Sequence, residues 1–353
     1  MMQIPEPVVS ENVKTFDHLR AASFIENMVN ARALGSAFDL GLVDYLTKNR
    51  EGVFNEILRQ LKCDGPGLEL ILSLLEANRV IVRQGEKICL SPEFIKALPY
   101  SDFMRAKIEF SNLVMHDFGD LFTLLIKSPE QFVHHARVFD FFGYNRCFES
   151  TPENVEHTRR WMRITTALTR YEAMSCMAYH DFSSSGKMLD IGGNSGEFAL
   201  QVCRQNPLIK TTIFDLPVVC DIGCEYMNTQ TESERVNFIK GNAFSDPIPN
   251  GFDMISFKSM LHDWPEYEAN QLIKKAGKAL EPGGRLLIFE RGPVDMSKTK
   301  WPYGDLPFLL FFRSFREPGI YEKQLRKLGF TDIKVQKIDL EMTFFLVTAK
   351  KEN

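Results

Sequence analysis

The chain has 353 residues, enough for about two domains with substantial hydrophobic cores. Hydrophobic residues make up 44% and charged residues 25%, which excludes general disorder and a collagen-like repeat. The formal net charge is −4, from 42 basic and 46 acidic residues, so overall charge provides no reason to bind nucleic acid or an anionic membrane.

Signals for export, membrane insertion and metal binding are weak throughout the sequence. The seven cysteines form no CxxC pair, so we expect neither a disulfide framework nor a metal site. The pair His134 and His135 has no cysteine or acid at ligand spacing and is interpreted as structural. The start of the chain resembles no secretory signal, and the apolar stretch Phe308–Phe312 is far shorter than the ~20 residues of a membrane span. We therefore expect a soluble, cytoplasmic protein.

The N-terminal half is predicted to be a helical domain spanning residues 1–182. Residues 1–16 lack periodicity and are predicted to form an arm, whereas apolar residues recur at helical spacing from Ala21 to Leu46. Between residues 50 and 95, two short helices and two β-rich runs follow one another, which is the order of a winged helix-turn-helix.

A winged helix can bind DNA or serve as a structural or dimerisation module. Its second helix, at about residues 67–78, carries Glu69 and Glu76 but no Lys or Arg. Because a helix that reads DNA normally brings basic side chains to phosphates and guanine edges, the sequence favours dimerisation.

After residue 183, strand-like and helical segments alternate along the chain. This alternation predicts an α/β domain over residues 183–353, with a Rossmann-like, doubly wound, mostly parallel sheet of seven strands. The expected strands are Met188–Ile191, Thr211–Phe214, Val236–Ile239, Met254–Phe257, Arg285–Phe289, Ile333–Gln336 and Thr343–Val347.

The most informative motif is a glycine-rich turn between a predicted strand and a helix. Asp190 ends the strand, Gly192, Gly193 and Gly196 form the turn, and Asp215 ends the next strand. Glycines let the backbone approach a ligand closely, and an acid in the position of Asp215 can bind both hydroxyls of an adenosine ribose. Nicotinamide cofactors and S-adenosylmethionine both carry such a ribose. The acid before the glycines suits a ligand with a cationic amino-acid tail and no phosphate.

Four motifs in this region resemble those of a known enzyme family. LDIGGNSG, FDLPVV, LHDW and PGGRLLIFE occur in the order and at the distances seen in small-molecule O-methyltransferases of the caffeate and acetylserotonin type, which are class I methyltransferases. The resemblance covers nearly the whole chain. It implies S-adenosylmethionine as cofactor, a small-molecule acceptor, and a homodimer formed through the N-terminal domain.

The resemblance also assigns cofactor-binding positions. In the family's glycine loop stand Gly192 and Gly193, but Asn194 replaces a usual glycine, which asparagine tolerates because it adopts left-handed conformations. The remaining positions implied to contact the cofactor are Asp215, Leu216, Asn242, Ala243 and Lys258. Asn242 replaces a usual acid.

His262 stands where the family has its general base, and Glu290 matches an acid that orients that base. Imidazole suits this task because it titrates near neutral pH, and a carboxylate beside it fixes the tautomer. A second family acid is expected just before Arg316, but this chain has Phe315 there, with Glu317 nearby.

The acceptor pocket is the part least defined by the sequence. The run Leu306–Phe312 lacks small polar residues and indicates an apolar, aromatic acceptor. Candidate lining residues are Met174, Phe311 and Arg313, the last either solvated or binding an acidic substituent.

The leading hypothesis is thus methyl transfer from S-adenosylmethionine to a hydroxyl of a small aromatic or polyketide-like metabolite. Two alternatives stay open. One keeps the cofactor but methylates carbon or nitrogen, or catalyses a rearrangement without methyl transfer. The other is a winged-helix, ligand-responsive regulator that binds DNA.

Overall fold

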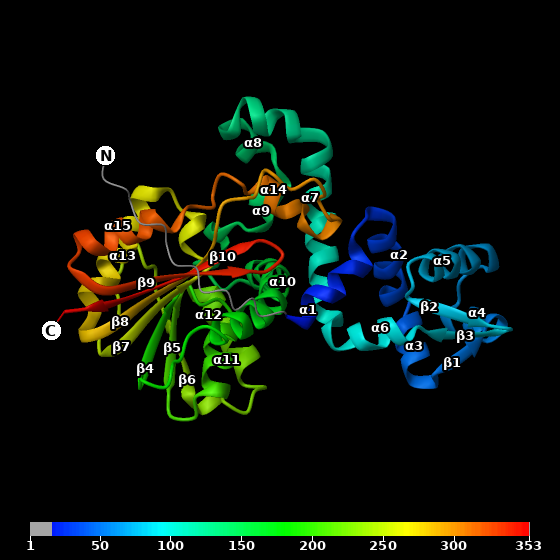
Figure 1. Ribbon diagram of the computed structural model, residues 1–353, viewed down its shortest axis with the longest axis horizontal. Coiled ribbons are helices and arrows are strands. Elements are labelled where there is room, and N and C mark those ends of the chain that lie inside the picture. The colour runs from blue at the N-terminus through cyan, green and yellow to red at the C-terminus, as the bar shows by residue number, and fades with distance from the viewer. Residues whose placement is uncertain (1–15, 353) are drawn as a thin grey trace, which may run out of the picture. The chain divides into compact units, whose positions relative to one another are not determined.

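The structure is a computed structural model that describes residues 16–352 (Figure 1). Backbone contacts group the chain into two compact units. We call residues 16–138 with residues 297–310 the helical unit, and residues 139–296 with residues 311–352 the sheet unit. The segment predicted to form an N-terminal arm lies outside the described residues, except for Phe16.

The helical unit combines helices with a small antiparallel sheet of order β1-β3-β2, in which β1 is Glu51–Val53, β2 is Ile81–Gln84 and β3 is Lys87–Leu90. Two helices followed by a hairpin therefore occur between residues 50 and 95, as the sequence predicts. The helices are α1 (Asp17–Ala21), η1 (Ala22–Ile25), α2 (Met28–Asp39), α3 (Leu42–Asn49), α4 (Phe54–Leu61), α5 (Gly65–Ala77), α6 (Pro92–Ala97), η2 (Leu98–Tyr100), α7 (Ser101–Lys127), α8 (Pro129–His135), η6 (Tyr303–Asp305) and α14 (Leu306–Leu310). Helix α9 (Arg137–Phe141) contains the border between the units in the chain.

Local side-chain signals set the ends of several of these helices. The side-chain oxygen of Asn27 accepts a hydrogen bond from the backbone N–H of Asn30 at 2.8 Å and caps α2. Asp64 caps α5 in the same way, through the N–H of Gly67 at 2.9 Å. Gly41 separates α2 from α3 at a φ of 76°, a conformation that glycine adopts without strain.

Residues 297–310 belong to the helical unit although they follow most of the sheet in the chain. Lys107 on α7 pairs with Asp305 at 3.0 Å, and both side chains are buried. The Tyr303 hydroxyl donates to the side-chain oxygen of Asn112, also on α7, at 2.7 Å. Because two distant segments meet only in the folded chain, no local sequence pattern predicts this assignment.

The sheet unit has seven strands in the order β6-β5-β4-β7-β8-β10-β9. All neighbouring pairs are parallel except those of β10, which runs antiparallel to β8 and β9. The strands are β4 (Lys187–Ile191), β5 (Lys210–Asp215), β6 (Val236–Lys240), β7 (Phe252–Lys258), β8 (Leu280–Arg291), β9 (Phe330–Asp339) and β10 (Thr343–Lys351). The central strands β4 and β7 are buried over most of their length, because helices cover both faces of such a sheet. The predicted fold class is confirmed.

The helices of this unit begin before its first strand. They are η3 (Tyr144–Cys147), α10 (Pro152–Met177), α11 (Glu197–Gln205), α12 (Pro217–Met227), η4 (Ser233–Arg235), η5 (Leu261–Asp263), α13 (Glu266–Ala279) and α15 (Pro318–Lys327). Helix α10 packs against α11 and α12, so the sheet unit extends to residue 139, well before the boundary expected near residue 183. The assignment of separate tasks to residues 1–182 and 183–353 stays a prediction.

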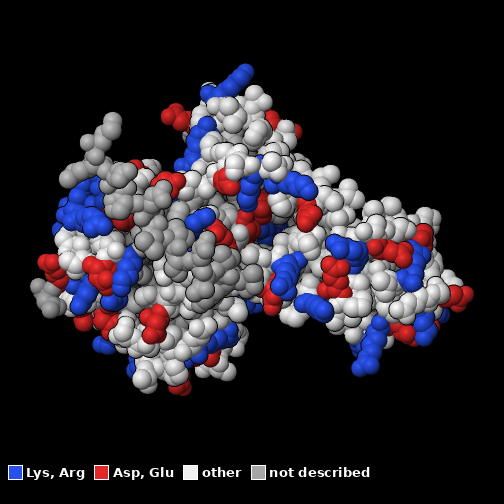
Figure 2. Space-filling model, viewed as in Figure 1, with Lys and Arg blue, Asp and Glu red and all other residues white. Residues whose placement is uncertain are grey.

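Over most of the face shown in Figure 2, Lys and Arg side chains are interspersed with Asp and Glu. Within residues 16–352, every helix is too short or too polar to cross a membrane.

Candidate functional site

The glycine-rich loop follows β4 and leads into α11. Gly192 and Gly196 have φ angles of 70° and 80°, which favour glycine. A Cβ atom on Gly192 would lie 2.5 Å from Cγ of Met260, and one on Gly193 would lie 2.7 Å from Oδ2 of Asp190. A side chain at Gly192 would therefore collide with Met260, and one at Gly193 with Asp190, so the loop at the carboxyl end of β4 favours glycine at both positions.

Asp190 supplies a buried carboxylate beside this loop. Its Oδ1 accepts a hydrogen bond from the Ser256 hydroxyl at 2.7 Å, whereas its Oδ2 is buried without a hydrogen-bond partner among the described residues. Burial raises the pKa of Asp190 to about 7, and the Ser256 hydrogen bond only partly offsets this effect. A donor group of a ligand would satisfy the unpaired oxygen.

Asp215 ends the neighbouring strand β5 and faces the same loop. Its Oδ2 accepts the backbone N–H of Asn194 at 2.8 Å, and its Oδ1 accepts that of Leu216 at 2.7 Å. Burial raises the pKa of Asp215 to about 6, although both backbone hydrogen bonds act to lower it. The predicted ribose acid thus lies beside the loop, with its carboxylate fixed by two amides.

The turn after β6 carries Asn242 and Ala243, the residues expected to contact adenine. The side-chain oxygen of Asn242 accepts the backbone N–H of Phe244 at 2.9 Å, and the Asn242 N–H donates to Asp246 at 2.8 Å. The carbonyl of Ala243 accepts a hydrogen bond from Lys275 at 2.6 Å. These bonds give the turn a defined shape. Asn242 stands where the family usually has an acid, and its amide oxygen still binds the backbone of the turn.

Lys258, predicted to contact the cofactor, binds protein groups in this structure. Its ammonium contacts the Thr169 hydroxyl at 2.8 Å and the carboxylate of Glu172, both on α10, and Arg291 binds the same carboxylate. Burial alone would raise the pKa of Glu172, but Arg291 and Lys258 hold it down at about 2. Sequence reasoning missed Glu172, because an acid within a long helix gives no sign that it will be buried.

His262 and Glu290 come together at the ends of β7 and β8. Nδ1 of His262 lies 2.6 Å from Oε2 of Glu290, whose Oε1 accepts the backbone N–H groups of Met260 and Leu261 at 2.8 and 2.7 Å. The His262 side chain is 13% exposed and that of Glu290 is 1% exposed. Burial lowers the pKa of His262, but the charges of Glu290 and Asp263 outweigh it and leave the pKa above its ordinary value.

Other groups meet the imidazole on its remaining sides. Nε2 of His262 lies 3.4 Å from Oδ1 of Asp263, whose Oδ2 accepts the Tyr144 hydroxyl at 2.8 Å. The buried ring of Phe315, in the position of the expected second acid, lies 5.4 Å from the imidazole ring between centroids. Arg316 donates to the carbonyl of Leu261 at 2.9 Å and so holds the same turn. The imidazole therefore has an aromatic neighbour and one firmly bound carboxylate.

The three residues proposed for an acceptor pocket have different surroundings. Met174 on α10 is 48% exposed. The ring of Phe311 lies 5.7 Å from that of Phe139, between centroids, and Arg313 is exposed with its guanidinium over the Phe312 ring at 4.3 Å. Their role in acceptor binding stays a prediction.

Trp161 on α10 carries a buried polar group that the sequence does not predict. Its ring packs near Tyr144 at 5.9 Å between centroids, and its buried indole N–H is without a hydrogen-bond partner among the described residues. A tryptophan on the apolar face of a helix is usually part of the core, so the sequence carried no signal for an unpaired donor.

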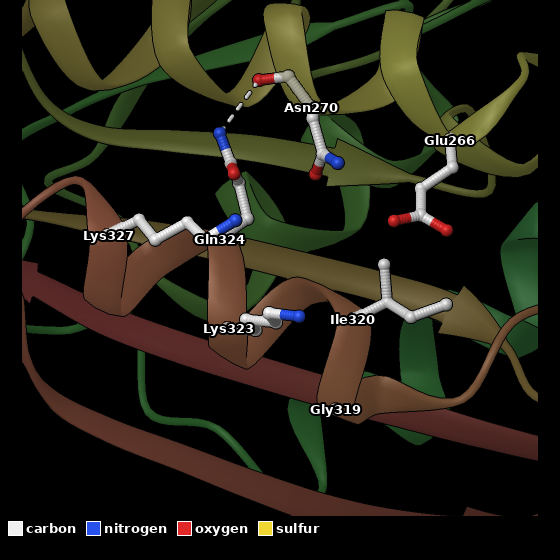
Figure 3. A pocket seen from close by; sticks show the side chains of 7 residues that line it. All are labelled: Glu266, Asn270, Gly319, Ile320, Lys323, Gln324 and Lys327. Atoms are coloured by element: carbon white, nitrogen blue, oxygen red, sulfur yellow. Dashed lines mark hydrogen bonds between the residues drawn. The ribbon is translucent and has the colours of Figure 1, made fainter.

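A separate hollow of about 170 Å³ lies between α13 and α15, and Figure 3 shows its lining. Gln324 donates a hydrogen bond across it to the carbonyl of Asn270 at 3.3 Å. The residues predicted for the site do not line this hollow, which is formed by Glu266, Asn270, Gly319, Ile320, Lys323, Gln324 and Lys327.

Comparisons with known proteins identify the family and the fold. The family model for the O-methyltransferase domain matches residues 127–330. The 3-hydroxy-5-methyl-1-naphthoate 3-O-methyltransferase of Streptomyces sahachiroi is 33% identical over 122 residues, 33% of this chain and 35% of that protein. The L-tyrosine C(3)-methyltransferase of Streptomyces lavendulae is 24% identical over 87% of this chain and 85% of its own length. The chain spans less than half the length of the first three curated relatives that it matches, at 44%, 35% and 45%.

Among solved structures, human N-acetylserotonin methyltransferase in complex with SAM has a TM-score of 0.72 at 19% identity, covering 92% of this chain and 94% of that chain. At this identity the match establishes a shared fold.

The contact between His262 and Glu290 leads to a titration experiment. Replacing Glu290 by Gln keeps an acceptor for the two backbone N–H groups but removes the charge that favours the imidazolium, so the pKa of His262 is expected to fall. Nuclear magnetic resonance titration of the histidine ring signals measures this change, with His157 as the internal control.

The same pair has a defined effect on stability. The raised pKa of His262 stabilises the fold below the ordinary histidine value of 6.5, and the lowered pKa of Glu290 stabilises it above the ordinary glutamate value of 4.5. The Glu290→Gln variant should therefore lose most stability between these two pH values. An unchanged His262 pKa in the variant would show that the carboxylate does not control the imidazole.

Proposed function

This chain belongs to the family of proteins with an O-methyltransferase domain, and we propose that it transfers a methyl group from S-adenosylmethionine to a hydroxyl of a small aromatic or polyketide-like molecule. The observation that carries the proposal is the contact of His262 with Glu290 at 2.6 Å. It provides a base of defined tautomer at the carboxyl ends of the parallel strands, where open α/β sheets bind ligands.

The loop at the end of β4 fits the cofactor. Gly192 and Gly196 give the loop the positive φ angles of a tight turn before α11, and Asp190 has a buried oxygen that lacks a donor among the described residues. Asp215 would bind the ribose hydroxyls, with Leu216 beside it, and the turn at Asn242 and Ala243 would hold the adenine. S-adenosylmethionine supplies an electrophilic methyl group when it is bound.

His262 would act on the acceptor. With Nδ1 protonated and held by Glu290, Nε2 is free of a proton and can accept one from the acceptor hydroxyl as the oxygen becomes a nucleophile. Glu290 then stabilises the resulting imidazolium. Asp263, 3.4 Å from Nε2, adds a second negative charge that favours the protonated ring.

The apolar character of the acceptor rests on sequence composition and on one relative. Residues 306–312 are almost entirely apolar, and by its name the relative from S. sahachiroi methylates a hydroxyl of a naphthoate. A hydroxyl on an aromatic ring is more acidic than an aliphatic one, so a single imidazole suffices to deprotonate it.

Carbon methylation is the main alternative. It is favoured by the relative from S. lavendulae, which by its name methylates carbon 3 of tyrosine, and by Phe315 in the place of the second acid.

A role as DNA-binding regulator has less support. Helix α5 would have to enter the major groove, but its charged side chains are the acids Glu69 and Glu76. Both of these acids pair with Arg83 of β2.

We also propose a homodimer formed through the helical unit. This unit exposes large apolar side chains on several helices, which is typical of an interaction surface. They are Met28, Val29, Leu40, Leu70, Ile95, Phe122, Ile126 and Val133. Light scattering during size exclusion is expected to give twice the chain mass of 40.5 kDa. A monomer at micromolar concentration would contradict the dimer.

Replacing His262 by Ala tests the base directly. Loss of a general base should slow methyl transfer to a phenol on the order of 10²–10⁴-fold, while the affinity for S-adenosylhomocysteine stays unchanged. The initial rate with a phenol that the wild-type protein methylates is the readout, and His180→Ala, in the same unit but outside the site, is the matched control. Near-normal turnover would exclude His262 as the base.

Replacing Asp215 by Ala tests the cofactor site. Loss of the charged acceptor should cost roughly 1.5–3 kcal/mol of binding free energy, or about 10- to 150-fold in affinity for S-adenosylhomocysteine by calorimetry. Asp253→Ala is the control, because Asp253 also accepts two backbone N–H groups, those of Gly186 and Lys187, away from the loop. Equal losses in both variants would mean that Asp215 acts only through the fold.

A further inference from the structure

The glycine-rich loop contains one residue whose side chain ties it to a neighbouring helix. Asn194 has a φ of 57°, which asparagine tolerates. Its side-chain oxygen accepts the backbone N–H of Ser195 at 2.7 Å, so its amide nitrogen points the other way. That nitrogen donates to the hydroxyl of Thr165 on α10 at 3.1 Å.

The Thr165 hydroxyl is oriented to receive this bond. Its hydrogen is directed at the carbonyls of Trp161 and Met162 within α10, at 3.2 and 3.1 Å. A lone pair of the oxygen is therefore left for the amide of Asn194. The polarity of each group in the chain of bonds is thus determined by its neighbours.

Further hydrogen bonds join α10 to the end of the glycine-rich loop and the start of α11. The Thr166 hydroxyl donates to the Ser195 hydroxyl at 2.7 Å, and Arg170 on α10 donates to the buried carboxylate of Glu197 at 3.1 Å. Gln201 donates to the same carboxylate at 2.7 Å. These contacts hold the loop and the start of α11, whereas the Thr165 bond holds residue 194 itself.

Residue 194 is also the one whose backbone N–H donates to Oδ2 of Asp215 at 2.8 Å. The side chain of Asn194 is held by Thr165, and the backbone N–H of the same residue holds the carboxylate of Asp215. A glycine would fit the backbone angle equally well, but it would have no side chain to bind Thr165 and would be more mobile.

From this arrangement we infer that the Thr165–Asn194 hydrogen bond positions Asp215 for the cofactor's ribose. Thr165 is a positioning residue, because it acts through residue 194 and not on the ligand. The inference rests on the proposed function, since it concerns the same cofactor site. It assigns a part of cofactor affinity to α10, whose sequence carries no cofactor motif.

A double-mutant cycle with S-adenosylhomocysteine tests the inference. Calorimetry is carried out on the full chain with Thr165→Val, Asn194→Gly and the double variant. Thr165→Ser keeps the hydroxyl and is the rescue variant. Thr158→Val is the matched control, because Thr158 is a buried threonine of α10 whose hydroxyl faces Cys147 at 3.6 Å.

Loss of the bond between Thr165 and Asn194 should weaken binding roughly three- to tenfold in Thr165→Val. Asn194→Gly should weaken it at least as much, because it also removes the bond from the Ser195 N–H. The double variant should be no weaker than the weaker single variant, because both changes remove the same bond. Thr165→Ser and Thr158→Val should bind as the wild type does. Thermal unfolding of the ligand-free variants shows whether each one is folded.

Three results would overturn the inference. They are unchanged affinity in Thr165→Val, additive losses in the double variant, and an equal loss in Thr158→Val. Each leaves the proposed function intact if the wild type binds S-adenosylhomocysteine. Failure of the wild type to bind would instead remove the proposed function, and this inference with it.

Discussion

The buried carboxylate of Glu290 is the group on which the site depends. At the end of β8 it accepts hydrogen bonds from two successive backbone N–H groups and contacts the imidazole of His262. The backbone bonds fix the turn after β7, and the contact with His262 fixes the ring carried by that turn. Because Glu290 is buried, its charge acts on the imidazole with little screening by water.

The parallel sheet explains why the other parts of the site meet at the same place. Asp190, Asp215, Lys258 and Glu290 stand at or near the carboxyl ends of β4, β5, β7 and β8, which are neighbours at the centre of the sheet. Helix α10 adds Thr165 to the glycine loop and Glu172 to the cations at the ends of β7 and β8. Helix α10 thus contacts both the glycine loop after β4 and the ends of β7 and β8.

The sequence predicts the seven strands and a mostly parallel sheet, because apolar runs alternating with helical segments are local signals. The pairing of His262 with Glu290 is implied by the family resemblance alone, and the structure places the two side chains in contact. The sequence did not predict that Lys258 would be bound by Glu172, since that pairing joins residues 86 positions apart. The assignment of residues 297–310 to the helical unit depends on the buried pair of Lys107 and Asp305 and is equally non-local. Phe315 departs from the family's pattern in the sequence, but only the structure shows its ring beside the imidazole.

Methyl transfer to an aromatic hydroxyl with His262 as base is the reaction proposed for this chain. The most direct measurement is mass spectrometry after incubation with S-adenosylmethionine carrying a deuterated methyl group and matched pairs of phenols and anilines. The result expected is one labelled methyl on the oxygen of at least one phenol, with the matching aniline unchanged and the product lost in His262→Ala. Labelling on carbon or nitrogen only, or labelling of oxygen that does not need His262, would contradict the claim.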